Sequence, residues 1–487
     1  HDIGKVSPLF QQQLKHGYLR APNFIFRHEI ASLFFISLLK EKDEKNAVIE
    51  MIVAHHKSVY EDVTNKGFLD LDENKDSFGI HSKNFTKWST DALGILEELG
   101  LKTHPISVEE AHESYEYAVG YCWSLEDGWS EWKGMLMAAD HYASALNEKT
   151  EINLVNLFIK PDLSFYNRQN KLYPLSMISA DDTRKHTMVT APTGAGKTDF
   201  LLRRCRGRVF YTLPFQASIN AMYDRIKDNL KKTNAQVYLL HASSELKVED
   251  GQLEERILQH HIGASVKVLT PHQMASIVFG IKGYESMAAD LQGCDVILDE
   301  VHTYSGEIQS IVLRIIEVLL SLDCRIHVGT ATMPSALYHQ ILTLLGGQEQ
   351  VYEVKLPDET LRDFNRHIIH KIDDWAKSID IIDDAIEKRN KILLICNQVK
   401  RSQNLYSQLS DLYPSVKKML IHSRFKRSDR QRLEQELNEV FNQSSEACIV
   451  IATQVVEVSL DISFDVMITE CAPIDALIQR FGRINRK

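Results

Sequence analysis

Between residues 187 and 360, short runs of aliphatic and β-branched residues alternate with segments of helical character. This alternation is typical of a parallel, doubly wound sheet whose strands are joined by helices. The runs that we expect to form strands are Val209–Leu213, Val237–Leu240, Val266–Thr270, Val296–Asp299 and Ile326–Thr330. Ligands bind such folds at the carboxyl ends of the strands, so polar residues at those ends are candidates for a functional site.

A second strand–helix series occupies residues 361–487, with the apolar runs KILLIC, KMLI, CIVIA and VMIT. The N-terminal part, residues 1–150, has instead a helical pattern with no glycine-rich loop, as in the apolar stripe from Val48 to Val53. Residues 151–186 contain prolines and mixed polar stretches, which indicates a connector. The expected architecture is an all-α domain, the connector and two parallel-sheet α/β lobes over 187–360 and 361–487.

Composition limits the kinds of protein that this chain can be. A chain of 487 residues is too long for one core, and 44% hydrophobic with 25% charged residues is ordinary for a soluble globular protein. The net charge of −10 means that any contact with nucleic acid must be a local groove. The longest apolar run, around Ile30 to Leu39, is too short to span a bilayer, and no signal peptide pattern is present.

The seven cysteines are scattered and form no C-x-x-C pair, which argues against a disulfide framework or a zinc knuckle and fits a reducing cytoplasm. The chain starts at His1 without Met and stops directly after a motif. We therefore expect it to be cut at both ends.

The segment APTGAGKT follows the apolar pair Met188–Val189 and precedes the helical stretch FLLRR. Glycines let the backbone turn and aim its N–H groups at phosphate oxygens, and the helix that follows presents its positive end. Lys197 would reach the β- and γ-phosphates of ATP, and the Thr198 hydroxyl would ligate Mg²⁺. The residues expected to hold the nucleotide are Thr193, Gly194, Ala195, Gly196, Lys197 and Thr198.

An acidic pair, Asp299–Glu300, ends the predicted strand in DVILDEVH. Asp299 would hold Mg²⁺ through water, and Glu300 would polarise the attacking water. The threonines of Thr330–Ala331–Thr332 would link the nucleotide site to the nucleic-acid site. Polar residues and backbone N–H groups at Pro214–Gln216 and Thr270–Gln273 would contact a nucleic-acid backbone.

Arginines 480, 483 and 486 recur at three-residue spacing in QRFGRINRK. On a helix, this spacing would project their guanidinium groups towards one side. Arg483 and Arg486 are the candidates to contact the γ-phosphate in the transition state, because arginine is a planar and permanently charged donor. Asp461, in EVSLD, would contact the ribose or hold an arginine. Support for adenine recognition is weak, since Gln169 is the one nearby glutamine and Ser176 follows Tyr173–Pro174–Leu175.

Histidines and carboxylates form an ordered set in the N-terminal part. The candidate metal ligands are His1, Asp2, His28, His55, His56 and Asp140. Imidazole and carboxylate suit divalent transition metals such as Mn, Co, Ni or Fe, and Asp2 could bridge two ions. Two ions about 3.5–4 Å apart can activate water and stabilise both oxygens of a phosphodiester displacement.

This order resembles the HD superfamily of metal-dependent phosphohydrolases. The resemblance implies one more histidine upstream of His1. It also implies that Lys5 steadies the scissile phosphate, as a basic residue does in HD nucleases.

The motifs after residue 186, taken together, resemble a superfamily-2 helicase. They are APTGAGKT, LPFQASINAMYDR, TPHQ, DEVH, TAT, ICNQV, HSRF, ATQVVEVSLD and QRFGRINR. The DEVH spelling, the phrases IHSRFKRSDR and ATQVVEVSLDISFD, and the HD pattern upstream narrow the resemblance to the type I CRISPR-associated helicase–nucleases.

That resemblance implies RecA-like lobes, ATP-driven 3′-to-5′ translocation on the displaced single strand of an R-loop, and metal-dependent cleavage of that strand. It also implies a guide-RNA surveillance complex as recruiter, a protein that acts as a monomer, and an accessory domain after the last motif.

Two alternatives stay open on the sequence alone. One is a DEAH-type RNA helicase with a structural helical domain, in which RNA stimulates ATP hydrolysis and the metal cluster has no function. The other is an ATP-gated switch whose HD domain hydrolyses a nucleotide or second messenger independently of any polynucleotide.

Overall fold

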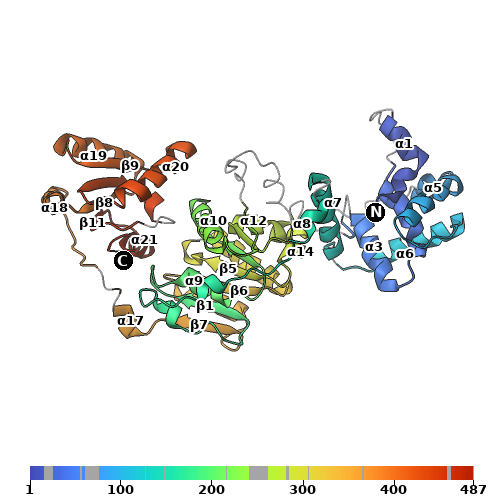
Figure 1. Cartoon of the computed structure of the whole chain (residues 1–487), viewed down its shortest axis with the longest axis horizontal. Coiled ribbons are helices and arrows are strands. Elements are labelled where there is room, and N and C mark those ends of the chain that lie inside the picture. The colour runs from blue at the N-terminus through green and yellow to red at the C-terminus, as the bar shows by residue number, and fades with distance from the viewer. Residues whose placement is uncertain are drawn as a thin grey trace. The chain divides into compact units, whose positions relative to one another are not determined.

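The structure is a computed structural model of the chain. It describes residues 1–487 except 16–25, 55–57, 61–75, 127, 147–149, 215, 241–261, 281–283, 305, 363, 365–366, 458–461 and 486–487. The described residues divide into two compact units (Figure 1). Unit 1 contains the described residues of His1–Leu157, residues 262–263 and Met274–Gln292, and unit 2 contains the rest.

The described part of unit 1 is helical. Its elements are η1 (Ile3–Val6), α1 (Pro8–Lys15), α2 (His28–Ser32), η2 (Leu33–Leu38), α3 (Lys42–Ala54), α4 (Ser77–His81), α5 (Phe85–Glu98), α6 (Val108–Trp123), α7 (Glu131–Leu146), α8 (Thr150–Leu154), α13 (Ser276–Phe279) and α14 (Tyr284–Leu291). The core centres on Phe34, whose ring packs edge-on against Phe85 and Tyr115. Ile49 and Val53 of the predicted apolar stripe are fully buried in this core, so α3 forms where the pattern indicated.

One segment of unit 1 comes from the middle of the chain. Met274–Gln292 lies in sequence between two strands of the first sheet, yet its helix α14 packs on α7 of the N-terminal part. The sequence pattern placed this segment in the first α/β lobe, because no local signal distinguishes a helix that packs on a neighbouring unit from one that covers its own sheet.

Unit 2 contains two parallel sheets in its described residues. The first has the strand order β3 (Val237–Leu239), β4 (Val266–Leu269), β2 (Val209–Thr212), β5 (Asp295–Asp299), β6 (Arg325–Thr330), β1 (His186–Thr190) and β7 (Val351–Lys355). Its helical elements are η5 (Ser164–Asn167), η6 (Pro174–Met177), α9 (Lys197–Arg204), α10 (Gln216–Leu230), α12 (Pro271–Met274), η9 (Val301–Thr303), α15 (Glu307–Ser321), α16 (Ser335–Leu344) and α17 (Asp358–Arg362).

The second sheet has the order β11 (Val466–Thr469), β8 (Lys391–Ile395), β10 (Cys448–Ala452) and β9 (Lys417–Ile421), again all parallel. Its helical elements are α18 (Ala376–Glu387), α19 (Val399–Leu412), α20 (Arg427–Glu436), η10 (Leu437–Phe441), η11 (Gln454–Val456) and α21 (Ile474–Phe481). Figure 1 shows this sheet and its helices in orange to red.

The central strands explain why the hydrophobic runs were readable. Every residue of β5 and of β10 is buried, as expected for strands of parallel sheets that are covered on both faces. The prediction of parallel α/β sheets is therefore confirmed. The strand β7 was not predicted, because only two of its residues are buried and two of the five residues in its sequence, VYEVK, are charged.

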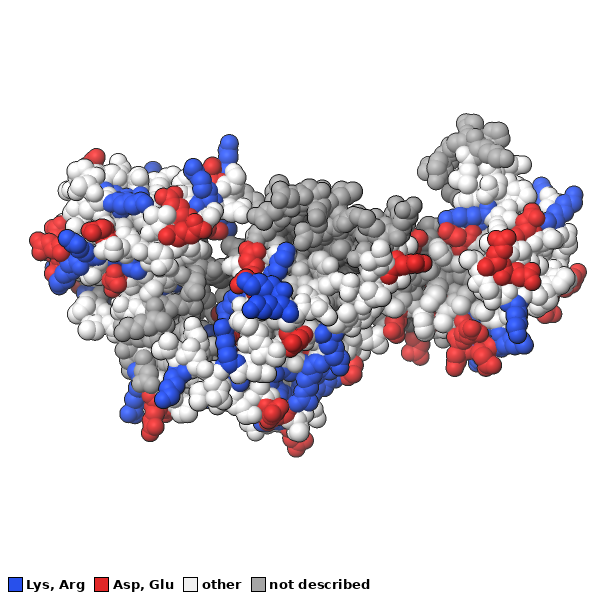
Figure 2. Space-filling model, in the orientation of Figure 1, with Lys and Arg blue, Asp and Glu red and all other residues white. Residues whose placement is uncertain are grey.

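Figure 2 shows Lys and Arg side chains gathered over the part of unit 2 that carries α9 and β7, while Asp and Glu are prominent on unit 1. Among the described helices, none combines the length and the apolar character needed to cross a membrane.

Candidate nucleotide and metal sites

The loop between β1 and α9 has the strand–loop–helix form expected of a phosphate-binding loop. Gly194 and Gly196 have φ angles of 87° and 91°, in the left-handed region that favours glycine. Gly196 directly precedes α9, so the positive end of that helix faces the loop. A Cβ on Gly196 would lie only 3.0 Å from Tyr173 Cβ, so the connector packs closely over this loop.

Lys197 spans the loop. Its Nζ donates to the carbonyl oxygens of Ala191 at 3.0 Å and Pro192 at 3.4 Å, and the residue is buried. An ammonium held by neutral carbonyls in a buried place is a strong attractor for an anion, because a phosphate would supply the missing negative charge.

The acidic pair lies at the carboxyl end of β5, as predicted. Asp299 Oδ2 accepts a 2.6 Å hydrogen bond from the Tyr211 hydroxyl, which also interacts with Thr198. Burial, and then the neighbouring charge of Glu300, raise the pKa of Asp299 above its ordinary value. A cation beside the pair would reverse this effect, so the carboxylates favour Mg²⁺ at this edge.

Glu300 has a φ of 57°, and its N–H donates to Gly329 O at 2.8 Å. This left-handed conformation turns the chain at the strand end. A cavity of about 750 Å³ opens here. It is lined by Arg168, Tyr173, Thr193, Gly194, Gly196, Lys197, Thr198, Asp199, Arg225, Asp299, Glu300, Lys391, Asn442, Gln443, Ile462 and Ser463. Residues from the parts of the chain that form both sheets therefore line one cavity.

Two arginines missed by the sequence reasoning lie in this cavity. Arg168 and Arg225 both pair with Asp199, with N–O distances of 3.0 and 2.7 Å. Arg168 also stacks on Phe165, 4.5 Å from the ring centroid. One indication of this pairing was present in the sequence, since Asp199 comes two residues after Lys197. Nothing in the sequence shows which arginines contact Asp199. The neighbouring Gln169 is exposed and does not line the cavity.

The arginine motif departs from the expected arrangement. Helix α21 ends at Phe481, so Arg480 and Arg483 do not share a face of this helix. Arg480 is 1% exposed and donates to Glu457 Oε1, Thr469 Oγ1, Glu470 O and Asn397 Oδ1 at 2.7–3.0 Å. It therefore holds the second sheet together.

Arg483 lies beyond the helix end and donates from Nη2 to Glu457 O at 2.6 Å. The preceding Gly482 approaches the phosphate loop, since a Cβ on it would be 3.4 Å from Thr193 Oγ1. Arg486 and Asp461 lie outside the described residues.

In unit 1, Asp2 brings the first predicted metal ligands together. Its Oδ1 lies 3.1 Å from His28 Nε2, and its Oδ2 lies 3.5 Å from His1 Nε2. Lys5 Nζ contacts the same Oδ2 at 2.6 Å. Both carboxylate oxygens thus face an imidazole, which is the donor set that a divalent transition metal favours.

The other predicted ligands lie on neighbouring elements. Helix α2 contacts α3, and α3 contacts α7, which carries the half-buried Asp140. His55 and His56 follow α3 directly but lie outside the described residues.

Two residues that support this cluster were missed. Ser32 Oγ lies 2.7 Å from His1 O and 2.9 Å from His28 O, and accepts from the Gly4 N–H at 2.9 Å. Gly4 is needed for this approach, because a Cβ on it would lie 2.1 Å from His28 O. Two features of the sequence could have indicated these supporting residues: the glycine two positions after Asp2 and the serine one helical turn after His28.

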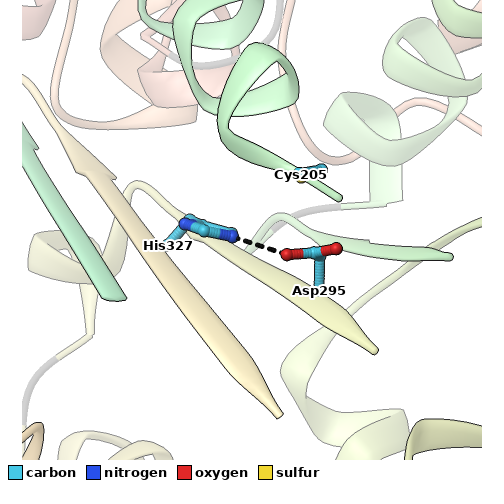
Figure 3. Close-up of side chains that lie close together, drawn as sticks. All are labelled: Cys205, Asp295 and His327. Carbon is cyan, nitrogen blue, oxygen red and sulfur yellow. Dashed lines mark hydrogen bonds and ion pairs between the residues drawn. The ribbon is translucent and has the colours of Figure 1, made fainter. Parts of the chain in front are cut away.

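A second group of possible ligands occurs in unit 2. Figure 3 shows Cys205, Asp295 and His327 close together, with His327 bonded to Asp295. Asp295 accepts from Arg325 twice at 2.8 Å, from His327 Nε2 at 2.9 Å and from the N–H groups of Arg206 and Gly207. Both oxygens are saturated and an arginine stands beside them, so this group is an ion-pair network at the amino ends of β5 and β6.

The sequence of this chain resembles those of known protein families. Residues 168–340 match the model of the DEAD/DEAH box helicase family. Residues 388–487 match the model described as CRISPR-associated nuclease/helicase Cas3, C-terminal. A Cas3 nuclease/helicase of Methanothermobacter thermautotrophicus is 25% identical and a Cas3 homologue of Methanocaldococcus jannaschii, described as a putative nuclease/helicase, is 28% identical, each over 100% of this chain. The chain is thus similar to Cas3 nuclease/helicases over its whole length. The predicted resemblance to CRISPR-associated helicase–nucleases is confirmed, the HD domain stays a prediction, and an ordinary RNA helicase is not favoured.

The chain spans 74% of the Methanocaldococcus relative and 66% of the Methanothermobacter relative. Among solved structures, T. fusca Cas3 with ATP superimposes with a TM-score of 0.62 at 19% identity, covering 100% of this chain and 66% of that one. A structure described as a CRISPR RNA-guided surveillance complex before nicking gives a TM-score of 0.55 at 20% identity, over 100% of this chain and 63% of that one. At these identities the structures support the Cas3-like fold alone.

Proposed function

We propose that this chain is an ATP-driven translocase on single-stranded DNA that is coupled to a metal-dependent endonuclease, and that it acts in type I CRISPR interference. The observation that carries the proposal is that one chain holds two separate sites. A phosphate loop faces an acidic pair in unit 2, and an Asp2-centred cluster of imidazoles lies in unit 1. Neither site alone would account for a relative of nuclease/helicases.

In the nucleotide half, Thr193, Gly194, Ala195 and Gly196 hold the phosphates with their backbone N–H groups. Lys197 exchanges its carbonyl partners for phosphate oxygens. Thr198 would hold Mg²⁺ directly, and Asp299 would hold it through water. Glu300 orients the attacking water. This assignment is supported by one cavity that is lined by all of these residues except the buried Ala195.

The second lobe completes the site. Arg483 and Arg486 neutralise charge that develops on the γ-phosphate, and Asp461 contacts the ribose or holds an arginine. For this role, Arg483 must leave Glu457 O, to which it now donates. Closing of the lobes on ATP and reopening after hydrolysis would then move the protein along the strand.

In the metal half, His1, Asp2, His28, His55, His56 and Asp140 hold two divalent ions, with Mn, Co, Ni or Fe favoured by the imidazole-rich donor set. The ions would supply an activated water and charge neutralisation for phosphodiester cleavage. We expect Asp2 to contribute both carboxylate oxygens as ligands, since they lie near different histidines. Lys5, 39% exposed beside Asp2, is placed to hold the scissile phosphate.

The finer parts of the proposal follow from the relatives. A structure described as a CRISPR RNA-guided surveillance complex contains a chain of similar fold, and we propose that a complex of this kind recruits this chain. The substrate is then the displaced strand of an R-loop, which a cytoplasmic, monomeric motor can enter. Residues 1–150 are the proposed HD domain, 151–186 the connector, and 187–360 and 361–487 the RecA-like lobes.

The test is cleavage of circular single-stranded DNA without ATP, with Mn²⁺, Co²⁺ or Ni²⁺ or with no metal, beside a lane of single-stranded RNA. Metal-dependent opening of the circle is the expected result, because the cluster in unit 1 needs no free end. An uncut circle together with RNA-stimulated ATP hydrolysis would replace the proposal with an RNA helicase that has a structural helical domain.

A further inference from the structure

The chain leaves the first sheet after β4 and returns to it at β5, and in between it forms a helix that belongs to unit 1. This helix, α14, packs along α7. The connections at both ends of this segment are short. It starts directly after the predicted nucleic-acid motif Thr270–Gln273, and only three residues separate its helix from β5, which ends at Asp299.

Three contacts hold α14 on α7. Lys133 Nζ pairs with Glu285 Oε1 at 2.6 Å, and the two side chains are 10% and 3% exposed. Gly134 lets the helices approach, because a Cβ on it would lie 2.4 Å from Glu285 O and 3.1 Å from Ala289 Cβ. Ser286 Oγ donates to Gly134 O at 3.3 Å.

This set of contacts fixes the register of the two helices. A buried ion pair adds little net stability over an apolar pair of the same size, but it is strongly unfavourable when its partners are separated. Gly134 lies at the point of closest approach and adds a steric requirement. If α14 slid along α7 or rotated on it, the ion pair and the close packing at Gly134 could not both be kept. The arrangement therefore restricts α7 to one position relative to α14.

The restricted helix carries a predicted ligand of the metal centre. Asp140 lies on α7 seven residues after Lys133, which is two turns, or about 10 Å, along the same helix. The helix held by α14 therefore also carries a proposed ligand of the metal centre.

We propose that the α7–α14 contact couples the motor to the nuclease. Lys133, Gly134 and Glu285 are positioning residues that keep the metal-carrying helix rigidly attached to the segment joining the nucleic-acid motif to the acidic pair. The inference rests on the proposed function. With the contact intact, movement by the motor raises cleavage at the metal centre. With the contact broken, each site still works, but movement no longer raises cleavage.

The test compares Gly134→Ala with Gly120→Ala in the full chain. Gly120 is also helical, but a Cβ on it would meet nothing within 4 Å. Three quantities are measured: cleavage of circular single-stranded DNA by Mn²⁺ without ATP, DNA-stimulated ATP hydrolysis, and the ratio of cleavage with ATP to cleavage without it. For Gly134→Ala we expect that ratio to fall about fivefold or more while the first two stay close to wild type. Gly120→Ala should match wild type in all three.

An unchanged ratio in Gly134→Ala overturns the inference while the proposed function stands. An unfolded Gly134→Ala would be replaced by the exchanged pair, Lys133→Glu with Glu285→Lys, beside each single change. The singles should lose ATP stimulation and the exchanged pair should regain part of it. Singles that keep full stimulation also overturn the inference. A wild-type protein that never cuts the circle instead contradicts the proposed function.

Discussion

Gln479 Nε2 of α21 donates a hydrogen bond of 2.8 Å to Nε2 of His302 in the DEVH motif. Because Nε2 accepts, the imidazole proton lies on Nδ1, which faces Thr330 Oγ1 at 2.6 Å. The Thr330 hydroxyl then donates to Thr332 O. One hydrogen-bonded path thus runs from the arginine motif to the threonine motif expected to link nucleotide and nucleic acid.

Replacing Gln479 by Ala removes the donor and leaves the His302 Nε2 without this partner. We expect kcat for DNA-stimulated ATP hydrolysis to fall about tenfold, the equivalent of one lost hydrogen bond, with a smaller change in the KM for ATP. Steady-state ATP hydrolysis measures both. Gln435→Ala, an exposed change on α20, is the control, and wild-type kcat in Gln479→Ala would refute the path.

Arg480 and Arg483 should behave differently although both belong to one motif. Arg480→Lys cannot satisfy four acceptors, so we expect a destabilisation of about 3 kcal/mol, seen as a lower Tm. Arg483→Lys should lower Tm less than Arg480→Lys does, because Arg483 Nη2 donates to Glu457 O whereas Arg480 donates to four acceptors. It should also lower kcat for ATP hydrolysis, since the proposed role of Arg483 is in the transition state. Equal losses of Tm in the two variants would show that Arg483 is structural as well.

Lys5 Nζ contacts Asp2 Oδ2 at 2.6 Å, so it would compete with a metal ion bound at that oxygen. Lys5→Met should therefore raise the affinity for Mn²⁺ about threefold, a modest effect because the pair is partly exposed. The same change should lower cleavage about tenfold, since the cation that holds the phosphate is lost. Calorimetric titration with Mn²⁺ and initial cleavage rates separate the two effects. Lys87→Met on α5 serves as control, and weaker Mn²⁺ binding in Lys5→Met would contradict the assignment.

Because His186 is buried, we predict that the stability of the fold depends on pH. Burial lowers its pKa to about 4, and the first strand needs the neutral ring because Nδ1 accepts from the Ile326 N–H at 3.1 Å. Between about pH 6.5 and 4 the unfolded chain binds the extra proton, so this contribution is fully present above that window and is lost as pH falls through it.

His186→Gln keeps an acceptor and does not titrate. Its unfolding free energy should fall less than that of wild type between pH 7.5 and 5.5, by about 1 kcal/mol or less per pH unit. Urea unfolding at the two pH values measures this, with the exposed His339→Gln as control. Identical pH dependence in wild type and His186→Gln would show that folding does not lower the pKa of the His186 ring.

The sequence was sufficient for the sheets and the phosphate loop because their signals are local. Continuous burial makes β5 and β10 apolar throughout, and the left-handed turns at Gly194 and Gly196 require glycine. By contrast, the helix α21 was extended past its true end, because arginines at three-residue spacing look helical whether or not the helix continues beyond Phe481.

Long-range partners could not be read in the same way. Nothing near Asp199 in the sequence identifies Arg168 and Arg225 as its partners, and nothing near Glu285 shows that it pairs with Lys133. Such pairs arise from the folding of distant segments onto one another. The metal ligands were predicted as an ordered set, and the structure brings His1 and His28 onto Asp2.

Separation of the two proposed activities tests the central claim most directly. Cleavage of circular single-stranded DNA with Mn²⁺ would be measured with and without ATP for Lys197→Ala and Asp2→Ala, together with DNA-stimulated ATP hydrolysis. We predict that Lys197→Ala nicks the circle without ATP as wild type does but gains nothing from ATP, and that Asp2→Ala hydrolyses ATP but leaves the circle intact. Full cleavage by Asp2→Ala would contradict the account.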